Sequence, residues 1–413
     1  MNQSGRPLTF AVLGGAGAMG RITVRDLIET TPLGTEVLIA DYNLPAAKKL
    51  AREMGPKARA IKVDVTQVGA TAKALKGVFA VVNACRHDFN VGIMKAALTA
   101  KVHYCDLGGL FHETKKQLKL NAQFKKAGLI ALCGIGAAPG VVNVLARAAA
   151  DEMERVDEIH VAVGNVDRTP GRGPTALGTS YSILTILDEA SMPAALFTDG
   201  KFTFVEPKFT FVEPMTGDDS VDFPAPVGRR RPARTIHSEV ATLPLSYKSK
   251  GVREVSFRIA FSDELDGRLR FLHALGLTST KPVKVGKSQV VPRDVLLALL
   301  AKQPKADAGG VPDEYEVLRV IVRGLRGGHK VEEVLDCHCP GIPKWHLGVD
   351  VDTGCPPSIF VQMLARGEIA ARGVLPPEVA IPAEPFFREL IARGMTIQKP
   401  RPPVGASSLS IGN

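Results

Sequence analysis

Cysteines and long apolar runs are scarce in this chain of 413 residues. The six cysteines have no regular spacing, and a chain of this length does not need a disulfide framework, so we expect reduced thiols. No run of about 18 apolar residues is free of charge, which predicts neither a membrane span nor a membrane partner. Residues 1–7 lack the charged, apolar and small order of a secretory signal, so we expect a cytoplasmic protein.

A dense basic patch is also missing, although the formal net charge is +10. Lys and Arg are spread along the chain with acidic residues between them, so we expect no nucleic-acid partner. The densest cluster, Arg229 to Arg231 with Arg234, lies in a Pro-rich stretch and is typical of a solvated loop. The excess charge favours anionic cofactors and substrates instead.

Short β-branched runs alternate with helical periodicity from residue 8 to about residue 150, which indicates a doubly wound α/β domain. The chain is too long for one ordinary core, so a second domain is expected. We expect strands at 8–13, 37–40, 60–63, 80–83, 102–105 and 129–132. Helices are expected at 21–30, 46–54, 68–75 and 91–100.

The sequence pattern changes after residue 143, where strands at 157–163 and 253–261 indicate a second sheet. Residues 317–323 and 330–337 predict a hairpin. Helices are predicted at 183–189, 293–301, 358–371 and 383–393, the third of them amphipathic. The repeat KFTFVEP at 201–207 and 208–214 predicts a surface loop or hairpin, and the Pro-, Gly- and Ser-rich tail beyond residue 399 is expected to be mobile.

A glycine-rich loop stands between the first predicted strand and the first predicted helix. It fits the pattern G-x-G-x-x-G, in which the glycines allow a tight turn, a close approach to pyrophosphate and close packing of helix on strand. The helix N-terminus offers free N–H groups and a positive dipole end to the phosphates. We therefore predict a dinucleotide site that includes Gly15, Ala16, Gly17, Ala18, Met19 and Gly20.

The ends of the next strands supply the other predicted cofactor contacts, because ligands of open α/β sheets gather at the carboxyl ends of the strands. Asp41 follows the last glycine by about 20 residues and is placed to accept hydrogen bonds from ribose hydroxyls, so NAD is favoured over NADP. Asp64 and Val65 are expected beside the adenine. Asn83, Ala84 and Cys85 are expected beside the nicotinamide ribose, although a packing role for Cys85 stays open.

Several segments together resemble the saccharopine dehydrogenase family, and within it the lysine 6-dehydrogenase type. The segments are VVNAC (81–85), VHYCDLGG (102–109), GAAPGVVN (136–143), VPRDVLL (291–297), VLRVIV (317–322), TGCPPSI (353–359) and RGVLPPE (372–378). The resemblance implies an NAD(P)-dependent oxidoreductase that acts on a carbon–nitrogen bond. It also implies a Rossmann domain, an inserted α+β domain for substrate binding and homodimerisation, and C-terminal helices that return to the Rossmann unit. We therefore place these parts at 1–145, 146–345 and 346–398, with a flexible tail at 399–413.

Oxidation of an amine by hydride transfer needs a group that removes an ammonium proton and stabilises the cationic imine. Asp106 ends a predicted parallel strand, and its carboxylate is expected to point into the crevice as the first candidate for these tasks. The following Leu107 and Gly108 would let the backbone approach the cofactor. A role for Asp106 as a helix cap stays open.

The loop after the sixth strand resembles the family's loop beside the nicotinamide and substrate. Its backbone amides are expected to hold a substrate carboxylate. Asn143 is expected either to orient that carboxylate or to have a role at the start of the next helix. The predicted substrate contacts here are Gly136, Ala137, Pro139, Gly140 and Asn143.

The middle domain contributes a second group of candidates. Glu239 is expected to bind an ammonium group, His237 to shuttle protons, and Arg234 to clamp a carboxylate, with Tyr181 as a further contact. Cys337, His338 and Cys339 lack a second Cys or His pair at zinc spacing, so we expect no metal.

Three functions remain open from the sequence. The first is oxidative deamination of the ε-amine of L-lysine by an NAD-dependent enzyme. The second, in the same family, is a saccharopine or carboxynorspermidine reductase that joins an aldehyde to an amine, with Arg86 or Arg234 as extra cations in the cleft. The third is a dinucleotide-binding protein without catalytic activity.

Overall fold

The computed structural model describes residues 8–170, 177, 182–203, 206–217, 219–303 and 310–399. The predicted contact Tyr181 and the tail from residue 400 onward lie outside the described residues. Within the described part, no helix is both long and apolar enough to cross a membrane.

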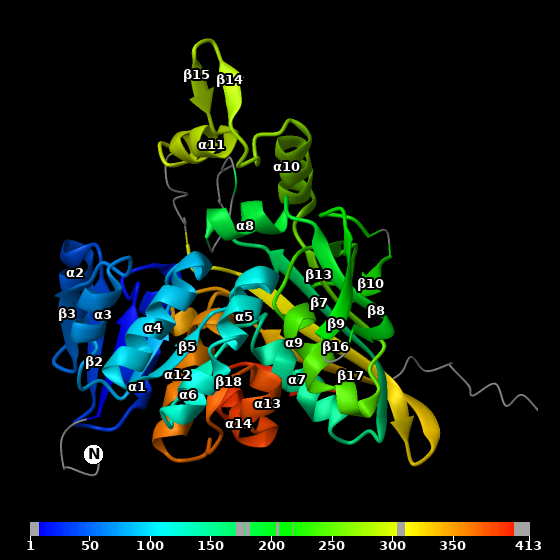
Figure 1. Ribbon diagram of the computed structural model, residues 1–413, viewed down its shortest axis with the longest axis horizontal. Coiled ribbons are helices and arrows are strands. Elements are labelled where there is room, and N and C mark those ends of the chain that lie inside the picture. The colour runs from blue at the N-terminus through cyan, green and yellow to red at the C-terminus, as the bar shows by residue number, and fades with distance from the viewer. Residues whose placement is uncertain are drawn as a thin grey trace, which may run out of the picture.

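The first sheet has seven strands, all parallel, in the order β18-β6-β5-β4-β1-β2-β3 (Figure 1). Its strands are β1 (Thr9–Leu13), β2 (Glu36–Asp41), β3 (Ala58–Lys62), β4 (Ala80–Asn83), β5 (His103–Asp106), β6 (Ile130–Leu132) and β18 (Gly373–Leu375). Side chains alternate along β1, so Phe10 and Val12 enter one buried cluster while Ala11 and Leu13 enter another. Both faces of the sheet are therefore covered, as in a Rossmann fold.

The helices of this unit connect successive strands. They are α1 (Ala18–Thr30), α2 (Leu44–Met54), α3 (Val68–Ala74), α4 (Asn90–Ala100), α5 (Leu110–Leu118) and α6 (Asn121–Lys126), with the 3-10 turn η1 (His87–Phe89). The α1 and α2 helices pack on one face of the sheet, whereas α3, α4 and α6 pack on the other. The predicted α/β fold class is confirmed.

The second sheet is mixed and has the order β19-β17-β16-β7-β13-β8-β9, with β12 paired to β13. Its strands are β7 (Arg155–Asp167), β8 (Ala194–Thr203), β9 (Glu206–Val212), β12 (Ala233–Arg234), β13 (Glu254–Ala260), β16 (Glu314–Arg326), β17 (His329–Cys339) and β19 (Thr396–Gln398). The predicted hairpin is β16 and β17, which pair antiparallel from Glu316 with Cys339 to Arg326 with His329. Residues 201–203 and 206–212 of the tandem repeat lie in the antiparallel pair β8 and β9.

Helices α7 (Val141–Ala150) and α9 (Glu239–Ser246) cover the inner face of this sheet, toward the Rossmann unit. One buried cluster runs from β1 through α7 and α9 to β7 and β13, so the two sheets share a continuous core. The remaining short elements are η2 (Lys248–Lys250), η3 (Pro343–Trp345) and the strands β10 (Val221–Asp222) and β11 (Arg229–Arg230).

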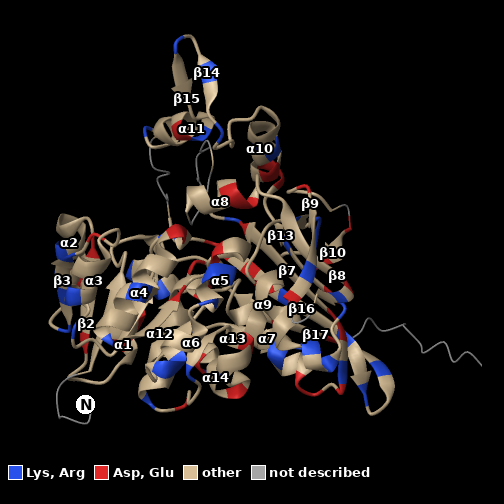
Figure 2. Ribbon diagram, viewed as in Figure 1, with Lys and Arg blue, Asp and Glu red and all other residues tan. Residues whose placement is uncertain are grey.

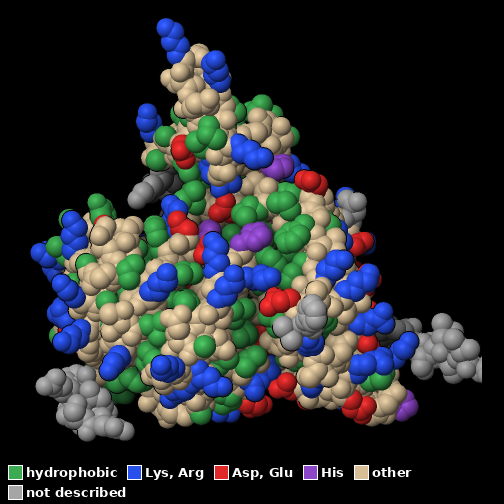
Figure 3. All heavy atoms as spheres, in the orientation of Figure 1, with side chains coloured by type: hydrophobic (Ala, Val, Ile, Leu, Met, Phe, Trp, Pro, Cys, Tyr) green, Lys and Arg blue, Asp and Glu red, His purple; other side chains and the backbone are tan. Residues whose placement is uncertain are grey.

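An arm projects from the body at the top of Figure 1. It consists of α10 (Asp263–Ala274), β14 (Val283–Val285), β15 (Ser288–Val290) and α11 (Pro292–Leu300), and α8 (Ile183–Glu189) lies at its base. A small core of its own, which includes Ile186, Leu187, Leu269 and Leu296, joins the arm to α8. Lys or Arg side chains, drawn in blue, mark its tip in Figure 3.

The C-terminal segment contains α12 (Val351–Ala365), α13 (Pro377–Ala380) and α14 (Ala383–Ala392) as well as β18 and β19. Helix α12 packs on α1, where Thr23 Oγ1 donates a 2.7 Å hydrogen bond to Gly354 O. The prediction of an amphipathic helix at 358–371 was wrong in its bounds and its exposure. The helix begins at Val351, includes Pro356 and Pro357, ends at Ala365, and is buried on nearly all sides.

Candidate active site

The glycine-rich loop joins β1 to α1 and is tied to β2 through Gly14 N, which donates to Ala40 O at 2.9 Å. A Cβ atom on Gly20 would lie 2.2 Å from Gly14 O, so only glycine lets the helix approach the loop this closely. Gly17 caps α1 without a side-chain hydrogen bond, and the first turn of α1 contains no acidic residue. Free N–H groups and a close backbone approach fit a pyrophosphate.

Asp41 lies at the carboxyl end of β2 beside this loop. Its Oδ2 accepts from Ala16 N at 3.0 Å and its Oδ1 accepts from Asn43 N at 2.8 Å. The register partner of Asp41 on β3 is Lys62, whose Nζ lies 5.3 Å from the ring centre of Tyr42. Lys62 was not identified from the sequence, because only the pairing of β2 with β3 places it here.

The polar side chains at the ends of the third and fourth strands differ in their exposure and in their hydrogen-bond partners. Asp64 Oδ1 accepts from Thr66 N and Oγ1, and these hydrogen bonds lower the pKa of the exposed Asp64 carboxyl. Asn83 is buried, and its Nδ2 donates to Asn90 Oδ1 at 2.8 Å and Tyr104 OH at 3.1 Å. Its Oδ1 accepts from Cys85 N at 3.0 Å, so both polar atoms of the side chain have partners within the protein.

Cys85 lies against the turn of the loop, since a Cβ on Gly14 would meet its Sγ at 3.2 Å. Burial, followed by the charges of Asp41 and Asp88, raises the pKa of the Cys85 thiol to about 12. The thiol is therefore neutral near pH 7, as a packing role requires.

Asp106 does not point into the crevice, so this prediction was wrong. Its side chain is fully buried and accepts hydrogen bonds from Tyr104 OH (2.8 Å), Gln117 Nε2 (2.5 Å), Gly108 N (2.9 Å) and Gly134 N (2.8 Å). Burial raises the pKa of the Asp106 carboxyl, and the four hydrogen bonds oppose that rise. Asp106 therefore links two loops at the carboxyl ends of the strands, the loops that contain Gly108 and Gly134.

The loop 134–140 makes internal hydrogen bonds where carboxylate contacts were expected. Gly136 N donates to Pro139 O at 2.7 Å, and Gly140 N donates to Asn143 Oδ1 at 2.9 Å. Asn143 Nδ2 donates to the buried Glu378 at 2.8 Å. Asn143 thus caps the first turn of α7 and binds α13, and the two glycine amides are not available to a ligand.

A buried acid–base cluster lies at the start of α9. His237 Nδ1 is hydrogen-bonded to Glu239 Oε2, and His237 Nε2 lies 4.0 Å from Glu189 Oε1 of α8. Burial alone would lower the pKa of His237, but the Glu239 carboxylate, its hydrogen bond and Glu189 outweigh burial, and the pKa of His237 is raised. Glu239 Oε1 is buried and has no hydrogen-bond partner among the described residues.

This cluster, His237 with Glu239 and Glu189, is held against the Rossmann loops. The ring of His237 stacks on Phe257 of β13 with centroids 3.7 Å apart. Ser238 Oγ donates to Leu110 O at 3.3 Å, and a Cβ on Gly108 would meet Pro139 at 2.9 Å and Ser238 Oγ at 3.7 Å. The cluster therefore lies beside the loops at the carboxyl ends of β5 and β6, where ligands of such sheets bind.

Helix α8 reaches from the second domain to the Rossmann loop after β4. Asp188 Oδ2 lies 3.6 Å from His87 Nε2, and Asp188 also binds Arg293 from the arm. Acidic residues mark α8 in Figure 2. Asp188 and Glu189 were not identified from the sequence, although two adjacent carboxylates at a helix end are a visible signal.

Arg234 does not join the cluster. It pairs in register with Arg258 on β13, the neighbour of Phe257, and successive strand residues face opposite sides of a sheet. Arg234 therefore faces the opposite side of the sheet from His237, where it is not placed to clamp a carboxylate bound beside that histidine. Arg86, the other expected cation, binds Asp88 through Nε at 3.0 Å.

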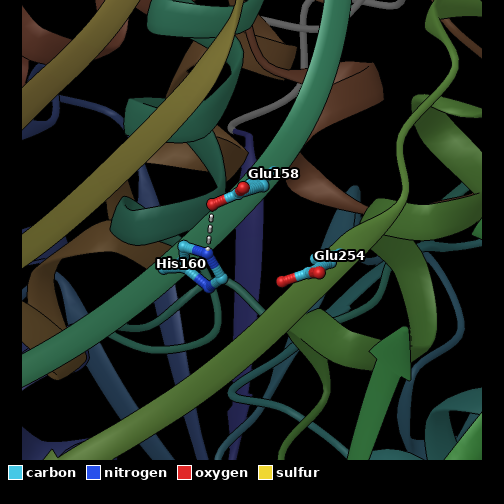
Figure 4. A group of neighbouring side chains, drawn as sticks. All are labelled: Glu158, His160 and Glu254. Atoms are coloured by element: carbon cyan, nitrogen blue, oxygen red, sulfur yellow. Dashed lines mark hydrogen bonds and ion pairs between the residues drawn. The ribbon is translucent and has the colours of Figure 1, made fainter. Parts of the chain in front are cut away.

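In the described part of the chain, two groups of metal-ligating side chains bear on the expectation that no metal is bound. Cys337, His338 and Cys339 alternate along β17, so the histidine faces away from the two thiols and binds Tyr315 OH at 3.1 Å. Glu158, His160 and Glu254 lie together on the outer face of the second sheet (Figure 4). Glu158 already binds His160 at 3.0 Å and Arg323 at 2.6 Å, and the Arg323 charge would repel a cation.

A dinucleotide cradle next to a buried acid–base cluster defines a nicotinamide-dependent oxidoreductase of the Rossmann class. The "Saccharopine dehydrogenase NADP binding domain" matches residues 10–132, and the "Saccharopine dehydrogenase C-terminal domain" matches residues 136–395. The chain belongs to the saccharopine dehydrogenase family, whose members are NAD(P)-dependent oxidoreductases that act on amine C–N groups.

Relatives of similar length span nearly the whole chain. Carboxyaminopropylagmatine dehydrogenase from Synechocystis is 24% identical over 394 residues, covering 92% of this chain and 95% of the relative. Carboxynorspermidine synthase from Vibrio cholerae is 24% identical over 414 residues, covering 92% and 94%.

Two solved structures share the fold. Saccharopine dehydrogenase (L-Glu forming) from Saccharomyces cerevisiae has a TM-score of 0.70 at 17% identity, covering 95% of this chain and 100% of that one. Homospermidine synthase from Legionella pneumophila, in complex with NAD, has a TM-score of 0.65 at 12% identity, covering 98% and 96%.

Proposed function

We propose that this chain joins an aldehyde to the amine of a polyamine or related diamine and reduces the C=N bond of the resulting imine, which gives a secondary amine. The observation that carries this proposal is the buried His237, held between Glu239 and Glu189 beside the cofactor-binding loops. A histidine with a raised pKa can deliver a proton near neutral pH, and carboxylates around it favour a cationic amine.

The overall reaction balances as aldehyde, amine, NAD(P)H and one proton giving secondary amine, NAD(P)⁺ and water. The bound dinucleotide supplies the hydride. The neutral amine attacks the aldehyde carbon, and the resulting hydroxyl group leaves as water once it accepts a proton, for which protonated His237 is placed. Glu239 and Glu189 stabilise the positive charge on His237 before this transfer and on the iminium nitrogen after it.

Glu239 also offers a contact to the substrate itself. Its Oε1 is buried and lacks a hydrogen-bond partner among the described residues, and a buried acceptor without a partner costs about 1–3 kcal/mol. An amine N–H would satisfy this oxygen. The catalytic role expected of Glu239 and His237 is thus retained as part of the proposal, and Asp106 takes a positioning role.

The names of the relatives favour secondary-amine formation over deamination of lysine. Two of them are named for products that combine a carboxyl group with a polyamine, carboxyaminopropylagmatine and carboxynorspermidine. A carboxyaminopropyl group attached through reduction implies a four-carbon amino-acid aldehyde as the second substrate. Release of ammonia from lysine has no such support.

The test follows NAD(P)H oxidation at 340 nm with L-aspartate semialdehyde and either agmatine or 1,3-diaminopropane. We expect turnover only when aldehyde and amine are supplied together. Reduction of NAD with L-lysine alone at alkaline pH, without turnover of the mixed substrates, would instead establish the lysine 6-dehydrogenase function. Tight dinucleotide binding without turnover in any of these assays would indicate a non-catalytic protein.

We also propose a preference for NAD(H) over NADP(H), because Asp41 faces the ribose position and would repel a 2′-phosphate. Lys62 beside it moderates that preference. In Asp41→Ser, the ratio of kcat/KM for NADH to that for NADPH should fall at least tenfold. An unchanged ratio would mean that another residue distinguishes the ribose of NADH from the 2′-phosphorylated ribose of NADPH.

We propose that the chain assembles as a homodimer in the cytoplasm. Exposed apolar side chains on the arm, among them Phe271, Leu275 and Leu299, support association with a second copy. The six cysteines are all free, which suits a reducing compartment. Multi-angle light scattering should give twice the chain mass of 44.0 kDa, and a single-chain mass would refute the dimer.

A further inference from the structure

Two arginines lie side by side on the outer face of the second sheet, the face turned away from the Rossmann unit. Arg234 of β12 and Arg258 of β13 are register partners in an antiparallel pair, so their side chains project to the same face. Phe257, next to Arg258, projects to the other face and stacks on His237. The arginine pair is thus separated from the candidate active site by the thickness of the sheet.

One exposed carboxylate, that of Asp219, forms long ion pairs with both arginines. Asp219 Oδ2 lies 3.8 Å from Arg258 Nη1 and 4.0 Å from Arg234 Nη2, beyond hydrogen-bond distance. The Asp219 side chain is 77% exposed, whereas those of Arg258 and Arg234 are 15% and 30% exposed. In the part of the chain that the structure covers, neither guanidinium has another ion-pair partner.

Arg319 on the same face shows what a fully paired guanidinium looks like here. Its Nε and Nη2 donate to the two oxygens of the buried Asp336 at 2.7 and 2.6 Å. The pair Arg234–Arg258 has the same half-buried setting but no such fork-to-carboxylate contact. Burial first, and then the charge of Arg234, lowers the pKa of Arg258, as expected for two cations that are not fully neutralised.

We propose that Arg234 and Arg258 form a binding site for a small oxyanion that carries two or more negative charges. Asp219 Oδ2 marks an oxygen position that both guanidiniums flank, and planar guanidiniums bind phosphate and carboxylate oxygens in bidentate fashion. Inorganic phosphate and a tricarboxylate such as citrate share this chemistry. Asp219 acts as an internal competitor that a ligand displaces toward solvent.

The experiment titrates the full chain with inorganic phosphate, and separately with citrate, by isothermal calorimetry at constant ionic strength. Saturating NADH is present throughout, so that the phosphate-binding loop at Gly14 to Gly20 is filled. We expect one saturable site per chain. Arg258→Gln and Arg234→Gln should each weaken binding at least tenfold, whereas Arg388→Gln, an exposed arginine on α14, should bind as the unaltered protein does.

Asp219→Asn provides an independent test with the opposite sign. It removes the competing charge at an exposed position, so the protein should fold normally and bind the anion more tightly, by threefold or more. Binding of phosphate alone, or of citrate alone, would support the site and identify the class of ligand.

Three results would overturn the proposal. The first is absence of saturable binding by either anion. The second is binding that neither Arg258→Gln nor Asp219→Asn alters. The third is a change of oligomeric state in Arg258→Gln, measured by light scattering, without anion binding, which would assign the pair to a contact between chains. None of these results bears on the reaction proposed at His237, which the aldehyde and amine assay tests separately.

Discussion

At the scale of single residues, Glu239 is the group on which the proposed chemistry depends most. It hydrogen-bonds His237 through one oxygen and leaves the other buried without a partner among the described residues. Glu239→Gln keeps the shape but removes the charge, so we expect kcat to fall by about 10²–10³, within the range for loss of an acid–base group. NADH binding, followed by its fluorescence, should be unchanged.

Glu384→Gln is the matched control, because Glu384 is exposed on α14 and its side chain is 88% accessible. Its kcat should equal that of the unaltered protein. A kcat for Glu239→Gln within threefold of the unaltered value would remove Glu239 from the chemistry.

The pH dependence of the reductive reaction follows from His237. Its pKa is raised by Glu239 and Glu189 against the effect of burial, so the imidazole stays protonated at pH values where an ordinary histidine is neutral. The activity that needs this proton should persist there and decline as the pH rises through the raised pKa. In Glu239→Gln the decline should move to lower pH.

The measurement is kcat/KM for NADH oxidation from pH 6 to pH 10 in both proteins. Glu384→Gln should retain the profile of the unaltered protein. An alkaline limb that stays in place, or moves upward, in Glu239→Gln would show that His237 is not the group that titrates.

At the scale of elements, we expect the contact between α1 and the glycine loop to decide cofactor binding. In Gly20→Ala the added Cβ would lie 2.2 Å from Gly14 O and 2.8 Å from Gly15 Cα, both backbone atoms that cannot move aside locally. The helix must therefore shift away from the loop, and NADH affinity should fall at least tenfold in a fluorescence titration. Gly69→Ala in α3 meets no atom within 4 Å and should bind NADH normally.

Gly69→Ala tests whether a loss of NADH affinity in Gly20→Ala comes from the loop contact and not from a glycine-to-alanine change in a helix as such. Alanine favours a helix over glycine by about 0.5–1 kcal/mol, so the control should be as stable as the unaltered protein or slightly more stable. Equal NADH affinity in both variants would mean that the loop does not hold the pyrophosphate.

Elements were predicted well from the sequence where their pattern is local. Strands β1 to β6 of the Rossmann unit and the hairpin of β16 and β17 show the expected runs, whereas β18 was not predicted. Helix α12 was misplaced, because Gly354, Pro356 and Pro357 usually interrupt helices. Burial between α1 and the sheet stabilises the helix despite them, and no local pattern carries that information.

At the scale of the whole molecule, the C-terminal segment connects the two units. Arg393, just after α14, binds Asp26 of α1 with Nε to Oδ1 at 2.7 Å and Nη2 to Oδ2 at 2.8 Å, and both side chains are buried. Arg393→Met leaves the Asp26 carboxylate buried without its partner, which typically costs about 3–5 kcal/mol. The urea midpoint of unfolding should fall accordingly.

Arg388→Met, within α14, is the control, since the Arg388 and Glu384 side chains are 68% and 88% exposed. Surface substitutions of this kind change stability by less than about 0.5 kcal/mol. A urea midpoint for Arg393→Met equal to that of Arg388→Met would show that the buried ion pair does not hold the C-terminal segment on α1.

The sequence by itself determined the family and predicted the cofactor loop and Asp41, because each depends on residues close together in the chain or on motifs kept in order. Only the tertiary structure decided which polar side chains meet. Asp106 is enclosed by Tyr104, Gln117 and two loop amides, while His237 gains Glu189 from a helix 48 positions earlier. Such contacts depend on how α8, α9 and the strand ends pack, and packing over long separations leaves no spacing in the sequence to identify.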